Sequence, residues 1–193
     1  MMIFLADIER VLAGREPELF SEHSGIHAAV ALVLREEPTG LQVLLIERAS
    51  HENDPWSGNV CFPGGKVENG DGDARVAAER ETLEEVGLDL TQALYLGRLS
   101  DISGAFRPIR VSCFVYGIRR VGTLRLNYEV SDAFWVPLTE LFDPARHCEA
   151  TVHFAGRTLT SPAIRLPQDG KPVLWGLTYR MVEQLLELIG KRL

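Results

Sequence analysis

The chain has 193 residues, of which 46% are hydrophobic and 24% charged, an ordinary globular composition with ample material for a single domain. Its net charge of −7 argues against a general nucleic-acid or membrane-surface binder, because both need a basic surface, although metal ions would still let it bind a polyphosphate. Its three cysteines are odd in number and far apart, which excludes a disulfide framework and a C-x-x-C metal site and favours a reducing, cytoplasmic setting.

Residues 2–13 predict a short amphipathic helix, and the apolar stretch at its start is too short for a signal peptide or a membrane span. A continuous β-branched and alanine-rich run over residues 26–34 predicts a buried strand. Residues 41–46 predict a second strand that forms a hairpin with the first, and residues 60–62 a short third strand. The sequence Pro63-Gly64-Gly65 then predicts a tight turn at which the backbone can approach a ligand closely.

Asp71 and Asp73 supply N-cap chemistry for a helix that runs to about Val86, with Val76 and Leu83 also expected on its buried stripe. The remaining predicted elements are strands over 94–101, 109–118 and 134–136, a short helix over 137–142, β-type segments over 150–166, and an apolar C-terminal helix over about 174–190. This irregular mixture of strands and helices predicts a mixed-sheet α/β layer fold rather than regular βαβ alternation.

The most informative segment is residues 80–87, Arg-Glu-Thr-Leu-Glu-Glu-Val-Gly, which places Glu81, Glu84 and Glu85 on one helical turn, called here the acidic turn. Like charges at this spacing cost about 0.2–0.5 kcal/mol per pair. Gly87 is a natural helix stop, so the acids also lie at the negative end of the helix dipole. A bound divalent cation would reverse both penalties. The alternative is a solvated charged face, but a glycine turn and an acidic glycine-rich loop just upstream favour a site.

Residues 80–88 resemble the second half of the signature motif of the Nudix hydrolase family, which reads Arg-Glu, an aliphatic, any residue, Glu-Glu, any residue, Gly and an aliphatic. Thr82 stands where an aliphatic residue is usual. The first half departs from the family, because Asp71 replaces a glutamate and Arg80 comes one residue late. The extra residue falls in the polar loop over residues 68–73, where an insertion costs little.

This resemblance implies a Nudix-type α/β/α sandwich with a mixed sheet, over about residues 25–190 of a single domain that spans 1–193. Within the family, the preceding segment resembles the coenzyme A pyrophosphatase group, through Leu44-Leu45, Arg48, and Gly58 followed by Phe62-Pro63-Gly64-Gly65. The ending Leu174-Trp175-Gly176-Leu177-Thr178 resembles that group too. A further arginine of the group's pattern is missing, since Asn53, Asp54 and Pro55 occupy its neighbourhood.

By this resemblance Mg²⁺ or Mn²⁺ is the expected cofactor, because hydrolysis of a diphosphate needs hard cations that neutralise the phosphates and activate water. The expected metal ligands are Glu81, Glu84, Glu85 and the Gly65 carbonyl. The expected catalytic residues are Glu81, Glu84 and Glu129, the last in a later loop where simple solvation is an equal alternative. The expected substrate-binding residues are Arg48, Trp56, Arg107 and Arg110, with surface solvation or core packing as the alternatives for the last three. The expected supporting residues are Arg80, Asp71, Gly64 and Gly87, with Arg80 paired to Asp71 or a neighbouring carboxylate.

The expected activity is metal-dependent hydrolysis of a nucleoside diphosphate linked to another moiety. Coenzyme A or an acyl derivative is the favoured substrate, giving 3′,5′-ADP and 4′-phosphopantetheine. ADP-ribose or dinucleoside polyphosphates are the alternative substrates, and a non-catalytic nucleotide-binding domain is the alternative of another class. No nucleic-acid or membrane partner is expected. The apolar C-terminal helix would suit a homodimer interface, although core packing explains it equally well.

Overall fold

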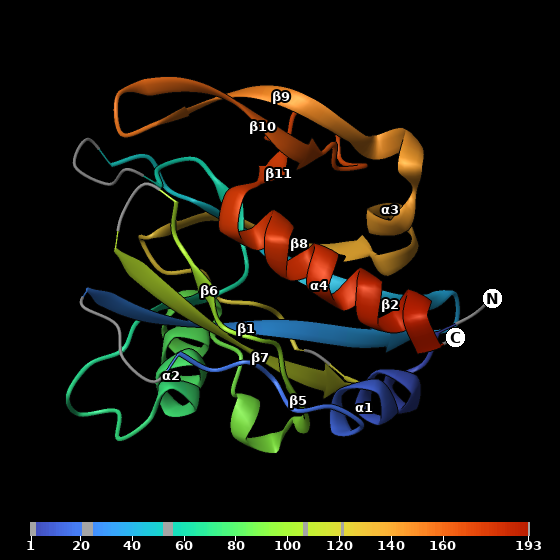
Figure 1. Cartoon of the computed structure of the whole chain (residues 1–193). Helices are drawn as coiled ribbons and strands as arrows, with labels where there is room; N and C mark the ends of the chain where they lie inside the picture. Colours follow the sequence, from blue (N-terminus) through green and yellow to red (C-terminus); the bar gives the residue numbers. More distant parts are fainter. Residues whose placement is uncertain (1–2, 21–24, 52–55, 106–107, 121, 193) are drawn as a thin grey trace.

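In the computed structural model, which describes residues 3–20, 25–51, 56–105, 108–120 and 122–192, a mixed β-sheet lies between helices (Figure 1). Within these residues the main sheet has eight strands, ordered β3-β2-β1-β7-β5, with β4, β6 and β8 pairing with β1, β7 and β2. The strands are β1 Ile26–Glu37, β2 Gly40–Arg48, β3 Val60–Cys61, β4 Gly64–Lys66, β5 Leu94–Arg98, β6 Ile102–Ser103, β7 Ile109–Ile118 and β8 Val130–Pro137. β1 and β7 run parallel and the other pairs run antiparallel, so the sheet is mixed, as predicted.

A second, three-stranded sheet and four α-helices complete the described part of the fold. The second sheet has the order β11-β10-β9, and in Figure 1 its long hairpin lies above α4. These strands are β9 His147–Phe154, β10 Arg157–Ile164 and β11 Leu174–Trp175. The helices are α1 Leu5–Ala13, α2 Ala74–Val86, α3 Leu138–Phe142 and α4 Gly176–Arg192, with short 3-10 turns at Leu90–Gln92 and Pro144–Arg146.

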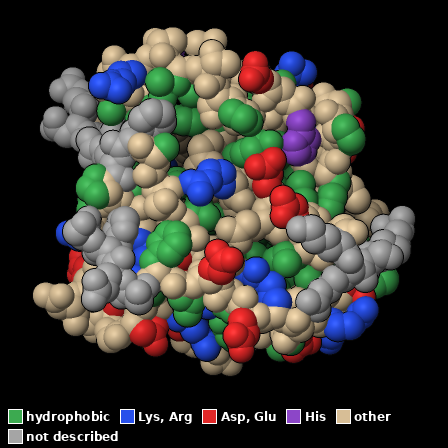
Figure 2. Space-filling view, viewed as in Figure 1, with side chains coloured by type: hydrophobic (Ala, Val, Ile, Leu, Met, Phe, Trp, Pro, Cys, Tyr) green, Lys and Arg blue, Asp and Glu red, His purple; other side chains and the backbone are tan. Residues whose placement is uncertain are grey.

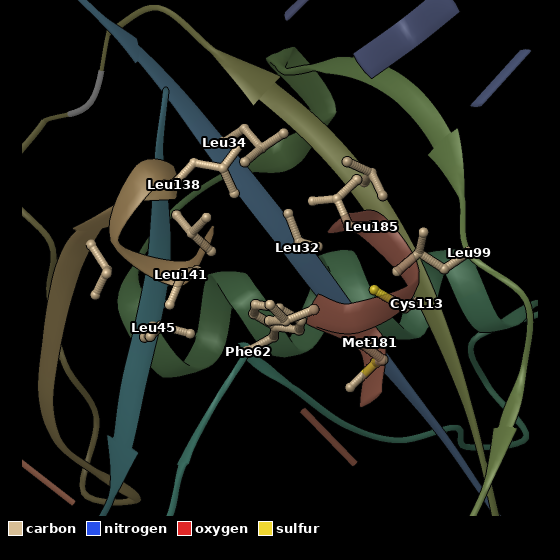
Figure 3. Packing of buried hydrophobic residues seen from close by; sticks show 14 of the residues in the cluster. Leu32, Leu34, Leu45, Phe62, Leu99, Cys113, Leu138, Leu141, Met181 and Leu185 are labelled. Carbon is tan, nitrogen blue, oxygen red and sulfur yellow. The ribbon is translucent and has the colours of Figure 1, made fainter. Parts of the chain in front are cut away.

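Alternate residues of β1 feed two separate apolar cores, one on each face of the main sheet. Leu32 and Leu34 face α1 and α4, where they join the larger core with Met181 and Leu185 (Figure 3). Ala31 and Val33 point the other way, with the apolar residues that pack against α2. Because β1 is buried on both faces, its sequence is continuously apolar rather than alternating. Helices therefore cover both faces of a mixed sheet, which confirms the predicted α/β/α sandwich.

Several boundaries differ from the predicted ones for identifiable reasons. The predicted strand over 94–101 ends earlier, at Arg98, and a separate short strand, β6, begins at Ile102. Between them the N–H of Asp101 donates to the carbonyl of Glu18 and not to a neighbouring strand. The strand predicted over 134–136 starts earlier, at Val130, because it pairs along β2. Residues 174–175 belong to β11 and not to the C-terminal helix, which begins at Gly176.

Candidate active site

The tight turn predicted at Pro63-Gly64-Gly65 is wrong, because Gly64 and Gly65 lie in strand β4, which pairs antiparallel with β1. Two independent features of the structure exclude a side chain at position 64. The backbone there has a φ of 144°, and a Cβ atom would lie 2.3 Å from the carbonyl oxygen of Ala29. The glycines therefore place bare main chain where β4 faces α2.

Gly65 is needed for a different reason, namely the close approach of the acidic turn. A Cβ atom at position 65 would lie 2.5 Å from Cδ and Oε1 of Glu81. Burial raises the pKa of Glu81, the neighbouring Arg80 lowers it, and the carboxylates of Glu84 and Glu129 raise it further. A cation beside the main chain of Gly65 would favour the ionised form of this carboxyl group.

Helix α2 carries the acidic turn and has clear signals at both ends. Asp73 is the N-cap, as expected, and accepts hydrogen bonds from the N–H groups of residues 75 and 76 at 2.7 and 2.9 Å. Gly87 ends the helix in the left-handed conformation, with a φ of 69°. Asp71 lies before the cap and serves a different purpose. The two ends fix which residues fall in the last turn.

The buried face of α2 differs from the predicted stripe. Val76 and Leu83 are exposed, whereas small and polar side chains face the sheet. The buried residues are Ala77, Ala78, Thr82, Glu85 and Val86. Thr82 satisfies its hydroxyl locally, by donating to the Ala78 carbonyl at 2.7 Å. Small side chains let the helix approach β4 closely, and the apolar periodicity of the helix is too weak to show this face in advance.

Glu85 is the acidic side chain most deeply buried in the helix, with 1% exposure. Its Oε2 accepts a hydrogen bond from the Gly64 N–H at 2.8 Å, and its Oε1 lies 3.7 Å from Nη1 of Arg48. Burial raises the pKa of Glu85 to about 8, the Gly64 N–H and Arg48 oppose this, and Glu81 and Glu129 add to it. At neutral pH this carboxyl group therefore holds a proton that a metal ion would displace.

Arg80 ties the helix to the loop before it. Its Nε lies 2.7 Å and its Nη2 3.2 Å from the two carboxylate oxygens of Asp71, and Nη2 also donates to the Lys66 carbonyl at 3.3 Å. Asp71 accepts a further hydrogen bond from the Glu68 N–H at 2.7 Å. The hydrogen bonds from Arg80 hold the pKa of Asp71 below its ordinary value, so Asp71 stays ionised. This two-point ion pair fixes the loop, the helix and β4 relative to one another.

Arg80 also touches two members of the acidic turn. Its Nη1 lies 3.1 Å from Oε1 of Glu81 and 3.1 Å from Oε2 of Glu84. Part of the repulsion inferred from the sequence is thus compensated within the protein. The side chain of Glu84 is 54% exposed and turns outward, unlike those of Glu81 and Glu85. Burial therefore disfavours the ionised form of Glu81 and Glu85, whereas water solvates the outward carboxylate of Glu84.

Glu129 belongs to a loop that is fastened to the end of α2. The main-chain N–H of Asn127 donates to the Glu85 carbonyl at 3.0 Å, and that of Arg125 to the Val86 carbonyl at 2.9 Å. The Glu129 carbonyl accepts from the Ala49 N–H at 2.8 Å. These contacts bring the Glu129 carboxylate close enough to act electrostatically on the buried acids of the turn.

The two substrate-binding candidates before the motif lie at the end of β2 and in the segment that follows it. Arg48 ends β2, and its guanidinium points toward Glu85. Trp56 is partly buried against the larger core, with its ring centroid 5.8 Å from that of Phe154. The structure thus brings Arg48 to the acidic turn, whereas Trp56 packs against protein.

Of the remaining two arginine candidates, the structure describes Arg110, which it places in a network away from the acidic turn. Arg110 donates to the Phe20 carbonyl, and its Nη2 lies 2.7 Å from Nδ1 of His27. His27 continues this network to Ser112, with 3.0 Å between Nε2 and Oγ. The guanidinium of Arg110 is therefore part of a hydrogen-bonded network with Phe20, His27 and Ser112. Arg107 lies outside the described residues.

The residues present fit a divalent cation by their chemistry. Glu81 and Glu85 flank the bare main chain of β4, and burial raises the pKa of both carboxyl groups although Arg80 and Arg48 oppose it. Carboxylate and carbonyl oxygens are the ligands that hard cations such as Mg²⁺ prefer. Within the described ranges, no three acidic, histidine or cysteine side chains already converge as a closed metal cage.

Sequence reasoning missed the part played by Asn127. Its side-chain Oδ1 accepts the N–H of Glu129 at 2.9 Å, which sets the direction of the loop, and its main chain holds the last turn of α2. The hydrogen bond from Asn127 to Glu129 could have been predicted, because an asparagine side chain that accepts the N–H two residues later is typical of a turn. The hydrogen bond from the Asn127 N–H to the Glu85 carbonyl could not have been predicted, because it joins segments far apart in the chain.

On the face seen in Figure 2, acidic and basic side chains are interspersed, and no continuous basic patch forms. Across the described ranges, no helix combines the length and apolar character that a membrane crossing requires.

Several proteins of known sequence are similar to this chain. A relative from Schizosaccharomyces pombe, an uncharacterized protein, is 39% identical over 161 residues and covers 70% of this chain. A probable nudix hydrolase of the same yeast is 29% identical and covers 84%. The chain spans only about half of these two relatives, 49% and 55% of their lengths. The uncharacterized Nudix hydrolase NudL of Yersinia enterocolitica is 31% identical over 178 residues, which cover 91% of this chain and 87% of the relative.

Solved structures share the fold at low sequence identity. The NUDIX domain of Shewanella oneidensis NrtR, solved with ADP ribose, has a TM-score of 0.58 at 17% identity and covers 92% of this chain and 96% of its own. The Caenorhabditis elegans Ap4A hydrolase has a TM-score of 0.50 at 23% identity, over 60% of this chain and 82% of its own. The sequence pattern of the NUDIX domain matches residues 25–155, so this chain belongs to the family of Nudix hydrolases.

Proposed function

We propose that this protein hydrolyses the diphosphate bond of a nucleoside diphosphate linked to another moiety, with Mg²⁺ or Mn²⁺ as cofactor. The observation that carries the proposal is the placement of Glu81 and Glu85 against the side-chain-free strand β4. A buried carboxyl group whose pKa is about 8 has little reason to be there without a cation to bind.

The cation would be held by Glu81, Glu85 and the Gly65 carbonyl, with Glu84 able to swing in from its exposed position. Divalent cations are general cofactors of this family, and when bound such an ion neutralises phosphate charge and acidifies water. Arg80 and Asp71 hold these ligands in place and are not proposed to touch the substrate.

The chain's own side chains supply orientation and proton transfer. Arg48, which reaches Glu85 from β2, is placed to bind a phosphate oxygen of the substrate beside the acidic turn. Glu129, in the loop fastened to α2, is the side chain we assign to accept the proton of the attacking water.

Coenzyme A or an acyl derivative is the favoured substrate, with 3′,5′-ADP and 4′-phosphopantetheine as products. The residues before the motif, from Leu44 to Gly65, and the segment around Trp175 support this choice through their resemblance to the coenzyme A pyrophosphatase group. ADP-ribose and dinucleoside polyphosphates form the second candidate class. It is favoured by the fold neighbours, one solved with ADP ribose and another named an Ap4A hydrolase.

The test is a comparison of initial rates on coenzyme A, acetyl-coenzyme A, ADP-ribose and diadenosine tetraphosphate, with Mg²⁺, with Mn²⁺ and with excess chelator. The proposal expects metal-dependent turnover, fastest on a coenzyme A substrate. Turnover fastest on ADP-ribose would replace the substrate but keep the mechanism. Tight nucleotide binding that needs no metal and yields no product would instead make this a binding domain.

We also propose that residues 1–193 form a single domain and that the protein acts in the cytoplasm. None of the cysteines Cys61, Cys113 and Cys148 forms a disulfide, as a reducing compartment favours. A homodimer would be tested by light scattering. The apolar residues of α4 are largely used in the core, which weakens the case for a dimer through this helix.

A further inference from the structure

Three aromatic side chains meet where the second sheet approaches the loop after β2, and we call Trp56, Phe154 and Trp175 the aromatic corner. The ring centroids of Trp56 and Phe154 lie 5.8 Å apart with planes tilted by 58°. Those of Phe154 and Trp175 lie 6.0 Å apart, edge to face at 80°. Tilted and edge-to-face contacts at this separation are favourable for aromatic rings. The corner thus joins the loop after β2 to β9 and β11.

The polar edge of Trp175 makes a specific contact beyond this packing. Its indole N–H donates a hydrogen bond to Oδ1 of Asn59 at 3.0 Å. β11, which contains Trp175, also lies beside β3, the strand that starts directly after Asn59. A partly buried indole N–H without an acceptor is costly, so this bond fixes the orientation of the Asn59 side chain.

Asn59 and Gly58 in turn hold the main chain of Arg48 from both sides. The Arg48 N–H donates to the Asn59 carbonyl at 3.0 Å, and the Arg48 carbonyl accepts from the Gly58 N–H at 3.1 Å. The Asn59 N–H closes the loop by donating to the Trp56 carbonyl at 3.1 Å. From this clamped main chain, the guanidinium of Arg48 extends to within 3.7 Å of Glu85.

We propose that Trp175 is a positioning residue, which holds Arg48 beside the acidic turn through Asn59; the inference rests on the proposed function. The arginine side chain is long, so a small rotation of its main chain moves the guanidinium by a large fraction of the 3.7 Å that separates it from Glu85. Trp175 lies outside residues 25–155, the part that matches the NUDIX domain. The C-terminal sheet thereby acts on the candidate active site without touching the substrate.

The decisive variant is Trp175→Phe, which keeps an aromatic ring near Phe154 but removes the N–H donor together with one ring of the indole. Its matched control is Trp135→Phe on β8, where the ring lies under the guanidinium of Arg35 at 4.4 Å and takes no part in the corner. Loss of one such hydrogen bond corresponds to about a five- to tenfold change in an equilibrium. Two measurements apply: hydrogen exchange at individual amides by NMR, and steady-state kinetics on the substrate that the wild type turns over fastest.

In Trp175→Phe we expect about tenfold faster exchange at the amides of Gly58 and Arg48, with unchanged exchange in β7. We expect a KM about fivefold higher, with kcat within about twofold, because the loss falls on phosphate binding. The control should change neither quantity. Adding Asn59→Ala to Trp175→Phe should have little further effect, because both remove the same bond.

Unchanged exchange at both amides would overturn the inference whatever the activity, and so would strictly additive effects of the two substitutions. Faster exchange with an unchanged KM would also overturn it, because the loop would then move without displacing Arg48. If the wild type shows no metal-dependent turnover at all, the proposed function fails, and the exchange rates alone decide whether Trp175 holds the loop.

Discussion

Replacing Glu85 with glutamine separates the metal-binding role of this side chain from its structural role. The amide has nearly the same shape, and its oxygen can still accept the Gly64 N–H, which now lies 2.8 Å from Oε2. Because burial raises the pKa of Glu85 to about 8, the wild-type group is already mostly neutral at pH 7 without metal. Glu85→Gln should therefore fold normally. Below pH 4.5, where the carboxyl group is protonated in both the folded and the unfolded chain, the substitution should change the free energy of unfolding by no more than about 1 kcal/mol.

The two proteins should diverge as the pH rises. A carboxyl group whose pKa is higher in the folded than in the unfolded protein adds stability that is complete below the unfolded value, 4.5, and is lost as the pH rises through the folded value, about 8. One proton per molecule corresponds to at most about 1.4 kcal/mol per pH unit. Without metal, the wild type should thus lose about 2 kcal/mol relative to Glu85→Gln between pH 6 and 7.5, which is about 4–8 °C in Tm.

The assay is thermal unfolding at several pH values with chelator and with Mg²⁺, beside metal-dependent turnover. Mg²⁺ should restore the wild type at high pH and leave Glu85→Gln unchanged, while kcat/KM of the variant should fall on the order of 100-fold or more. Parallel curves of Tm against pH for the two proteins would refute the electrostatic reasoning. Turnover at the wild-type level in Glu85→Gln would refute the catalytic role.

Four further substitutions test neighbouring parts of the site. Gly65→Ala should push the Glu81 carboxylate aside and lower kcat/KM by at least about tenfold with a small change in Tm, because the new methyl group meets only the end of a flexible side chain. Gly64→Ala should instead unfold the protein at a Tm lower by about 5–10 °C, since it combines backbone strain with a clash against a carbonyl oxygen; a Tm loss no larger than that of Gly65→Ala would contradict this. Arg80→Lys should lower the free energy of unfolding by about 1–3 kcal/mol and kcat/KM by about tenfold, because lysine cannot form the two-point ion pair; full activity with normal stability would show that the pair is dispensable. Glu129→Gln should lower kcat by about 10²-fold or more with little change in metal affinity measured by calorimetry, and an unchanged kcat would remove Glu129 as the base.

Elements with strong local signals could be predicted from the sequence. The strand Ile109–Ile118 and the helix that ends at Gly87 have the predicted bounds, because a continuous apolar run and a glycine stop are local features. The sheet edge at Gly64 could not be predicted, because paired glycines usually mark turns. Only the partner strand β1 makes an extended conformation there favourable, and that partner lies more than thirty residues earlier in the chain.

The buried face of α2 was predicted poorly for a related reason. Pattern reasoning assigns the largest apolar side chains to the interior, yet Leu83 is exposed and Glu85 is buried. A helix whose carboxylates contact a strand of glycines must lie close to that strand, and small residues on its packing face make this possible. The requirements of the site therefore replace the usual apolar periodicity of a buried helix face. An inverted burial pattern next to a glycine strand is therefore itself a signal of a site.

The departure from the family spacing shows how the fold tolerates change beside this site. An additional residue before Arg80 would displace an acid that lay on the helix itself, but Asp71 lies in a loop and not on α2. That loop returns Asp71 to Arg80, with 2.7 Å between Oδ1 and Nε, and the Glu68 N–H holds the second oxygen at 2.7 Å. The aspartate side chain is one methylene shorter than glutamate, and the longer loop supplies the missing reach. A loop shortened by one residue should accordingly favour Asp71→Glu, whereas the present loop should accept this substitution only with loss of the two-point pair, which is readily measured as a lower Tm.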